Sequence, residues 1–245
     1  MADVPEAVAL ARARLFQAHD GPIGELIPAP RNRCILAQTR NRSTAMSMQG
    51  SPAEDVPVEE PQAPRQPDLA VSFERLSRLA PIGKAEIMGN IALHFSRLAA
   101  EADLTTPLRV CHFLAQAAHE TDRFRTLEEK GGKKQFAKYE GREDLGNTEP
   151  GDGARYHGRG IFQLTGRANY KRIGRMLNID LEGRPELALD PRISVQIAFA
   201  YWRDRKINAA ADRDDAARVT QLINGGLNGL AERRQLLTTA KGIWF

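Results

Sequence analysis

The sequence predicts a mainly α-helical domain behind a proline-rich extension. From about residue 71 onward, apolar side chains recur at helical spacing, and the alternation typical of strands is almost absent. By contrast, nine of the fourteen prolines lie within the first 67 residues. We therefore assign residues 1–70 to a disordered extension and residues 71–245 to a folded helical domain.

The extension contains few large apolar side chains. Residues 51–68, SPAEDVPVEEPQAPRQPD, carry a proline every three to five positions. Because such a segment cannot bury enough surface to offset the entropy of the chain, we expect it to be an extended linker. Met46 or Met48 is an alternative start residue. If translation begins at Met48, residues 1–47 do not belong to the natural chain.

The folded domain begins with three predicted helices. Apolar residues at helical spacing cover residues 73–79 and 87–98. Thr106 followed by Pro107 is typical of a helix start, because a hydroxyl caps the first amides and proline suits the first helical position. This third helix reads LRVCHFLAQAAHE and ends near Glu120.

The rest of the domain is predicted to be helical apart from one long surface loop. Glycines and charged residues dominate residues 131–160, which favours a loop there. Helical periodicity then returns in four segments: residues 168–177, 194–203, 216–223 and 231–243.

Composition excludes several classes of protein and site. Cys34 and Cys111 are too few for a disulfide framework or a thiolate zinc site. No run of about 18 apolar residues is present, and the N-terminus lacks the basic and apolar regions of a signal peptide. We therefore expect no membrane insertion, and a cytoplasmic location until lysis or non-classical export.

Three glutamates follow one another closely in the segment HETDRFRTLEEK: Glu120, Glu128 and Glu129. Hydrolysis of a glycosidic bond requires two carboxyl groups, which lie roughly 6.5–9.5 Å apart in an inverting pair. A continuous helix would separate Glu120 from Glu129 by about 13.5 Å. The helix must therefore end shortly after Glu120. Residues that disfavour a helix interior follow at once: Thr121, Asp122 and Thr126.

Two further segments are rich in residues that suit a binding site. Within YHGRGIFQLTGRANY, residues 156–170, two glycines allow the backbone to pass close to a ligand. Amide and hydroxyl side chains that suit sugar binding follow: Gln163, Thr165 and Asn169. The segment INGGLNGLAERR, residues 223–234, is by itself typical of a helix end and loop.

Known metal and phosphate motifs are absent from these segments. His119 and Glu120 begin an HExxH-like pattern, but Arg123 stands where the second zinc-binding histidine belongs. The glycines match neither GxGxxG nor GxxxxGK[ST]. We therefore expect no metal and no organic cofactor.

Taken together and in this order, the segments resemble glycoside hydrolase family 19, the chitinase and phage-endolysin family of the lysozyme-like superfamily. The shared pattern is AHE, a second Glu nine residues on, then YEGR, LGN, GDG, GRG, QLTGR, NY, YW and VTQLINGG. The resemblance covers about residues 72–243. It implies a mainly α, lysozyme-like domain with two lobes and a central cleft.

The resemblance also implies an inverting mechanism, with Glu120 as general acid and Glu129 as general base. Spacing alone leaves Glu128 as a competitor for the base. Thr165 matches the hydroxyl residue that helps to hold the attacking water. Positions that bind sugar or steer the second carboxylate are matched by Gln163, Asn169, Asn224 and Arg233. Two more residues are either cleft residues or structural ones: Tyr156 and Arg159.

The implied partner is a polysaccharide with β-1,4-linked N-acetylglucosamine, either chitin or peptidoglycan, and not nucleic acid; we expect a monomer. Residues 71–245 hold 28 basic and 22 acidic side chains, a net charge of 28 − 22 = +6, which favours an anionic wall polymer.

Two other interpretations stay open. One is a lytic enzyme that uses a single Glu and releases an anhydro sugar, and the other is a non-catalytic glycan-binding module.

Overall fold

The structure is a computed structural model that describes residues 68–245. The extension predicted over residues 1–70 lies outside the described residues except for its last three positions, and so do Cys34 and both alternative start residues. The described part consists of helices joined by loops, and its β-pairing is limited to two isolated bridges. The predicted mainly helical fold is therefore confirmed.

The longer helices follow the predicted order. They are α2 (Phe73–Leu79), α3 (Ala85–Leu98), α4 (Pro107–Glu120), α7 (Arg167–Leu177), α8 (Pro191–Asp204), α10 (Ala216–Asn224) and α11 (Leu230–Trp244). Short helices that periodicity did not predict are η1 (Ala99–Ala102), α5 (Lys133–Phe136), η2 (Ala137–Tyr139), η3 (Glu143–Leu145), α6 (Asp152–Arg155), η4 (Pro185–Leu189) and α9 (Asn208–Ala211). Four of these short helices lie within residues 131–160, so the predicted surface loop is in fact folded.

Capping residues explain where the helices begin. Thr106 caps α4 by accepting a hydrogen bond from a first-turn amide at 3.3 Å, and Pro107 occupies the first helical position, as predicted. Ser72 caps α2 in the same way at 3.1 Å. Asp190 caps α8 in front of Pro191.

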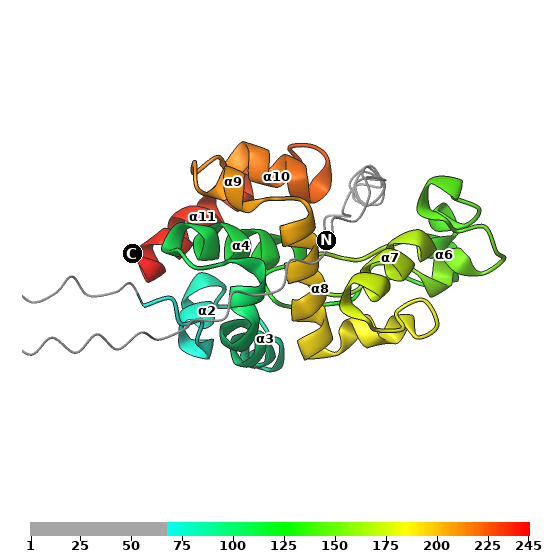
Figure 1. Cartoon of the computed structure of the whole chain (residues 1–245), viewed down its shortest axis with the longest axis horizontal. Coiled ribbons are helices and arrows are strands. Elements are labelled where there is room, and N and C mark those ends of the chain that lie inside the picture. Colours follow the sequence, from blue (N-terminus) through cyan, green and yellow to red (C-terminus); the bar gives the residue numbers. More distant parts are fainter. Residues whose placement is uncertain (1–67) are drawn as a thin grey trace, which may run out of the picture. The chain divides into compact units, whose positions relative to one another are not determined.

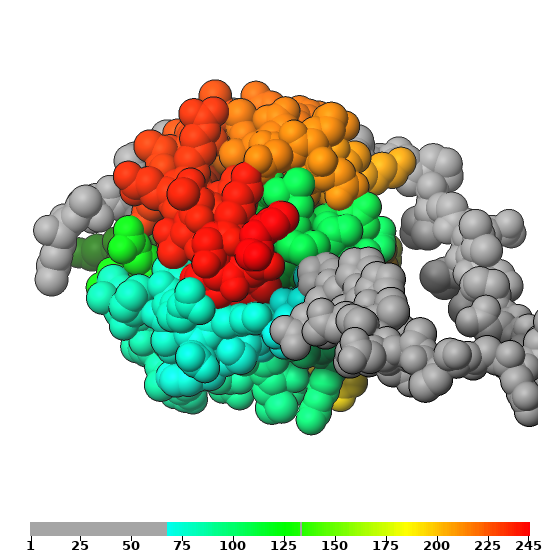
Figure 2. Space-filling view, turned by 90° about the vertical axis from the view of Figure 1, so that its left-hand side faces the viewer, coloured from blue at the N-terminus to red at the C-terminus, as the bar shows by residue number. Residues whose placement is uncertain are grey.

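The main apolar core lies between α3, α4, α8 and α11 (Figure 1). Helix α4 packs along α11, and α3 packs along α8. At the centre, the rings of Phe95, Phe113 and Phe199 meet edge to face with centroids 5.2 to 5.4 Å apart. The C-terminal part of α11 (red) lies between the segments of α2 (cyan) and α9–α10 (orange) in Figure 2.

A second, smaller apolar core forms within the segment of short helices. Its buried members are Phe136, Tyr139 and Leu145. An ion pair joins this segment to α7, because Arg167 donates to both oxygens of Asp152 at 2.6 and 2.8 Å. Tyr139 of this small core contacts Glu129, which is described below.

Three findings concern membranes, metals and thiols. None of the helices in residues 68–245 is both long and apolar enough to cross a bilayer. Within the same residues, no group of three or more His, Cys, Asp or Glu side chains is arranged to hold a metal ion. Cys111 is a buried free thiol in the main core, and burial raises its pKa to about 12.

Candidate active site

Helix α4 ends at Glu120, as the spacing of the carboxylates requires. The hydroxyl of Thr121 donates to a carbonyl of the last helical turn at 2.7 Å and accepts from the amide of Phe124 at 2.9 Å. Asp122, Arg123 and Phe124 then adopt φ values of 51°, 57° and 60°, in the left-handed region. The predicted break in the helix is confirmed, and the backbone changes direction directly after Glu120.

This left-handed turn is stabilised by its surroundings. A left-handed conformation costs roughly 1–2 kcal/mol for each residue that is not glycine. The side chain of Phe124 is fully buried in the main core, and its carbonyl accepts a hydrogen bond from the amide of Lys84 at 3.1 Å. The guanidinium of Arg123 lies 3.2 Å from Glu232 of α11. Burial and these contacts offset the strain and fix the path of the turn.

Glu120 forms a buried ion pair with Arg233 of α11. Its Oε1 lies 2.5 Å from Nη2 of Arg233, and the two side chains are 1% and 0% exposed. Arg233 also donates to the side-chain oxygen of Gln116 and to the carbonyl of Asn228. Removing one partner of such a pair typically costs about 3–5 kcal/mol, because a buried charge is left uncompensated. The predicted acid is therefore held firmly between α4 and α11.

Asn224 shapes the loop that leads into α11. Its amide nitrogen donates to the carbonyl of Asn228 at 2.9 Å, and its amide oxygen accepts from the backbone of Gly226 at 2.9 Å. Asn228 thereby binds both Asn224 and Arg233 through one carbonyl. The structure thus brings two predicted residues, Asn224 and Arg233, into one network with Glu120.

Glu129 lies on a segment that pairs with the backbone of Gly158. Its amide donates to the Gly158 carbonyl at 2.9 Å, and its Oε2 accepts from the Gly158 amide at 3.2 Å. Its Oε1 accepts from Nζ of Lys138 at 3.0 Å and from the hydroxyl of Tyr139 at 3.1 Å. The Glu129 side chain is 20% exposed. Its carboxylate is therefore oriented by three donors from two different segments.

Glu128, the competitor for the base, has different partners. Its Oε1 lies 2.9 Å from Nε2 of His157 and 3.5 Å from Nε of Arg159. The side chain is 47% exposed, and the residue pairs with Arg159 in an isolated bridge. Successive side chains of an extended segment point to opposite sides, so only one of the two glutamates can face Gly158. That residue is Glu129.

Three oxygen atoms meet around Gly158. A Cβ atom at this position would lie 2.8 Å from Oε1 of Gln163, 3.2 Å from Oε2 of Glu129 and 3.3 Å from Oγ1 of Thr165. The three oxygens therefore lie close together beside the Cα atom of Gly158, where any larger side chain would crowd them. A carboxylate, a hydroxyl and an amide oxygen are suitable partners for a bound water.

The loop that supplies these oxygens is held by its own side chains. Asn169, which is buried, donates to the carbonyl of Thr165 at 2.6 Å. Gln163 has a φ of 53° and donates to the carbonyl of Gly160 at 3.0 Å, which leaves its amide oxygen turned towards Gly158. The structure thus brings Gln163, Thr165 and Asn169 together with Glu129, although Asn169 acts on the loop backbone.

Tyr156 and Arg159 occupy structural positions. Tyr156 is buried and donates its hydroxyl to the carbonyl of Glu182 at 3.0 Å. Arg159 is buried as well and donates to the carbonyl of Arg155 at 2.9 Å and to the hydroxyl of Tyr170 at 3.1 Å. Of the two interpretations that the sequence left open for this pair, the geometry favours the structural one.

Two buried tyrosines act as neutral donors near the site. The hydroxyl of Tyr170 donates to the carbonyl of His157 at 2.9 Å, and that of Tyr201 donates to the carbonyl of Leu222 at 2.9 Å. Burial raises the pKa of both Tyr170 and Tyr201 above the ordinary value, because it disfavours the phenolate. Both hydroxyls therefore keep their protons and their backbone contacts.

Lys138 and Tyr139 are contacts of Glu129 that sequence patterns did not predict. Tyr139 begins the YEGR segment, and Lys138 is one of four lysines that follow Glu129 within nine residues. Both residues therefore lie in segments with visible signals. No periodicity, however, relates positions nine and ten residues along a folded loop to one carboxylate.

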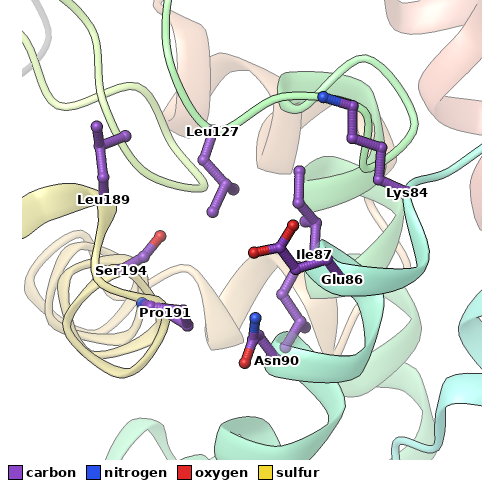
Figure 3. A pocket seen from close by; sticks show the side chains of 9 residues that line it. Lys84, Glu86, Ile87, Asn90, Leu127, Leu189, Pro191 and Ser194 are labelled. Carbon is purple, nitrogen blue, oxygen red and sulfur yellow. The ribbon is translucent and has the colours of Figure 1, made fainter.

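A separate hollow of about 150 Å³ lies between α3 and the start of α8, beside Leu127 (Figure 3). Its polar lining includes Lys84, Glu86, Asn90 and Ser194. Among the described residues that line it, Glu86 is the only carboxylate, so the hollow lacks the pair that glycoside hydrolysis requires. None of the predicted site residues lines it.

Comparison with known proteins gives one family. The model of glycoside hydrolase family 19, described as chitinase class I, matches residues 85–217. A glycosyl hydrolase family 19 domain-containing protein of Haemophilus influenzae is 38% identical over 98 residues, which cover 40% of this chain and 47% of the relative. Endochitinase 1 of Theobroma cacao is 33% identical over 153 residues, covering 51% and 48%. The chain thus spans about half the length of the curated relatives it matches.

A solved structure has the same fold. The crystal structure of chitinase C from Streptomyces griseus HUT6037 matches with a TM-score of 0.59 and 24% identity. The match covers 72% of this chain and 93% of that chain. The likeness confirms the predicted lysozyme-like helical fold.

Proposed function

The chain belongs to glycoside hydrolase family 19, the chitinase class I family, and we propose that it is an inverting glycosidase that cleaves β-1,4 linkages in polymers containing N-acetylglucosamine. The observation that carries this proposal is the meeting of Glu129, Thr165 and Gln163 oxygens around Gly158. A carboxylate beside a hydroxyl has the composition needed to activate a water molecule.

In the water-activating step, Glu129 is the base. Its Oε2 accepts a proton from a water whose oxygen attacks the anomeric carbon. Thr165 donates its own hydrogen to the carbonyl of Gln163 at 2.9 Å, so its lone pairs are free to accept the second hydrogen of that water. Thr165 thereby orients the attacking oxygen, and Glu129 supplies the basicity.

In the leaving-group step, Glu120 is the acid. It enters the step in its protonated form, transfers that proton to the glycosidic oxygen as the bond to the anomeric carbon breaks, and is left as the carboxylate. The Arg233 guanidinium, 2.5 Å from Oε1, stabilises the charge that this step creates. The ion pair therefore supports the product side of the proton transfer.

The substrate is a neutral chitin-type glycan or the peptidoglycan of a bacterial wall. Relatives named endochitinases support the first. The net charge of +6 over residues 71–245 supports the second, because the peptide arms of peptidoglycan carry carboxylates. Either polymer would be bound by a single copy of the chain.

The test compares wild type with Glu120→Gln, Glu129→Gln and the matched variant Glu128→Gln. Reducing ends released from colloidal chitin and turbidity of permeabilised bacteria measure activity on both substrates. We expect the first two variants to lose at least 100-fold in kcat on the true substrate, in line with general acid–base catalysis, and Glu128→Gln to stay within a few-fold of wild type.

Product analysis separates the proposal from its competitors. Inversion at a β linkage gives the α anomer first, which early NMR spectra of the products detect. An anhydro sugar as product, or full activity of Glu129→Gln, would identify a single-Glu lytic enzyme instead. Binding of glycan without new reducing ends would identify a non-catalytic module.

A further inference from the structure

The carboxylate of Glu129 is contacted from two separately packed parts of the chain. On one side, the amide of Gly158 donates to Oε2 at 3.2 Å. On the other side, Lys138 and Tyr139 belong to η2, within the segment of short helices. Tyr139 is 1% exposed and forms part of the small apolar core. That core therefore has a polar edge directed at the predicted base.

Lys138 contacts Oε1 of the Glu129 carboxylate, whereas the Tyr139 hydroxyl contacts both oxygens. Lys138 Nζ lies 3.0 Å from Oε1 and 4.9 Å from the centre of the Tyr139 ring. The Tyr139 hydroxyl lies 3.1 Å from Oε1 and 3.2 Å from Oε2. With Oε1 bound to the ammonium, Oε2 is the Glu129 oxygen that lies beside Gly158, as Oγ1 of Thr165 does.

We propose that Lys138, together with the Tyr139 hydroxyl, is a positioning residue that fixes the Glu129 carboxylate so that Oε2 receives the proton of the attacking water. The proposal rests on the proposed function, because it assigns a geometry to the same base. It also explains why Glu129, and not Glu128, fits that role: the ammonium binds Glu129, while Glu128 is held by His157 and Arg159.

The physical need for such a residue follows from the side chain itself. The terminal torsion of a glutamate is broad, so an isolated carboxylate samples many orientations. An ammonium is a compact charge that attracts one oxygen strongly and thereby narrows this range. Because catalysis is sensitive to displacements of about 1 Å, turning Oε2 away from Thr165 would lower the rate on the order of 100-fold.

Lys138 contributes little to the stability of the fold. Its side chain is 21% exposed and that of Glu129 is 20% exposed, so solvent screens the pair in part. Replacement of Lys138 by a neutral side chain of similar length should therefore leave the protein folded. The Tyr139 ring, by contrast, packs in the small core, so only its hydroxyl can be removed safely.

The test measures kcat and KM separately on a soluble, uncharged N-acetylglucosamine oligomer, with thermal unfolding in parallel. Lys138→Met should lower kcat at least tenfold with KM within about twofold, and Lys138→Arg should restore much of the loss because the positive charge returns. Tyr139→Phe should lower kcat less than Lys138→Met. The matched control is Lys171→Met on α7, which removes another lysine–glutamate pair, to Glu182 at 3.2 Å, and should leave both constants unchanged.

A double variant separates positioning from a general effect on the protein. If Lys138 acts through the base, Lys138→Met should have no further effect in a Glu129→Gln background. Lys138→Met with wild-type kcat would overturn the inference, and so would equal losses in the wild-type and Glu129→Gln backgrounds. If Glu129→Gln itself retains full activity, the proposed function fails instead, so the two failures are distinguishable.

Discussion

Gly158 is the single residue whose replacement tests the proposed water site most directly. Its φ does not lie in the left-handed region, so the backbone accepts alanine. The added methyl group would occupy the point that lies 2.8 to 3.3 Å from the oxygens of Gln163, Glu129 and Thr165. We expect Gly158→Ala to lower kcat on the order of 100-fold and to change the free energy of unfolding by about 1–3 kcal/mol at most. Steady-state kinetics and urea unfolding measure the two effects.

Gly89 provides the control for this substitution. It lies inside α3, and a Cβ atom there would meet nothing within 4 Å. Gly89→Ala should therefore raise stability by about 0.4–1 kcal/mol, because it restricts the unfolded chain, and should leave kcat unchanged. A Gly158→Ala enzyme with wild-type kcat would show that catalysis does not use the space beside Glu129.

At the same scale, the sequence predicts which motifs come together in the site, but not which atoms each side chain contacts. Glu129, Thr165 and Gln163 come together because their motifs fold against one another. Tyr156, in contrast, lies in the same motif and yet points into a buried contact with a carbonyl. Lys138 could not be predicted as a partner, because a flexible side chain reaches its contact only after the loop has folded.

At the scale of an element, the turn after α4 has an unusual composition for its conformation. Arg123 has a φ of 57°, which glycine adopts at no steric cost and which β-branched residues avoid. We expect Arg123→Val to be less stable than Arg123→Gly by about 1–2 kcal/mol. Both variants lose the same contact with Glu232, so their difference in urea unfolding reports the backbone alone.

Arg125 is the matched position for this comparison. It lies two residues further on, is also exposed, and has no positive φ. There the order should reverse, since glycine only adds freedom to the unfolded chain while valine fits the backbone. The same order at both positions would mean that left-handed strain does not govern the turn.

The success of prediction at this scale depends on element length. Helices such as α4 and α8 are long enough for periodicity to appear, and their caps fix the first residue. Helices α5 and α6 span four residues each, which is too short for a period of 3.6 to be recognised. Their segment therefore resembled a loop, although Phe136, Tyr139 and Leu145 pack together within it.

At the scale of the whole described part, polar side-chain contacts join helices to segments that are distant in sequence. Arg109 of α4 donates to both oxygens of Asp212 at 2.7 Å. His112, one turn further along α4, lies 2.9 Å from Asp214, which also binds Lys241 of α11. These contacts connect α4, which carries Glu120, to the segment between α9 and α10 and, through Asp214, to α11. Protonation of His112 or Asp214 therefore alters contacts between parts of the fold that are distant in sequence.

His112 contributes to the pH dependence of the stability of the fold. Burial lowers the pKa of His112 below its ordinary value of 6.5, although the hydrogen bond to Asp214 opposes the shift. Below pH 6.5 the unfolded chain therefore binds a proton that the folded protein does not, so the stability present at higher pH is lost as the pH falls from 6.5 towards the folded pKa. One such group gives a slope of at most about 1.4 kcal/mol per pH unit.

Asp214 produces a second loss at lower pH. Burial would raise the pKa of Asp214, but hydrogen bonds from Lys241 and His112 outweigh it and lower the value below 3.8. Its stabilising contribution is present above pH 3.8 and is lost below it. We expect urea unfolding of His112→Gln to show a weaker pH dependence between about pH 6.5 and 5 than wild type, with the loss below about pH 4 retained. An unchanged slope over the upper range in the variant would assign the first loss to other groups, because glutamine cannot take up a proton there.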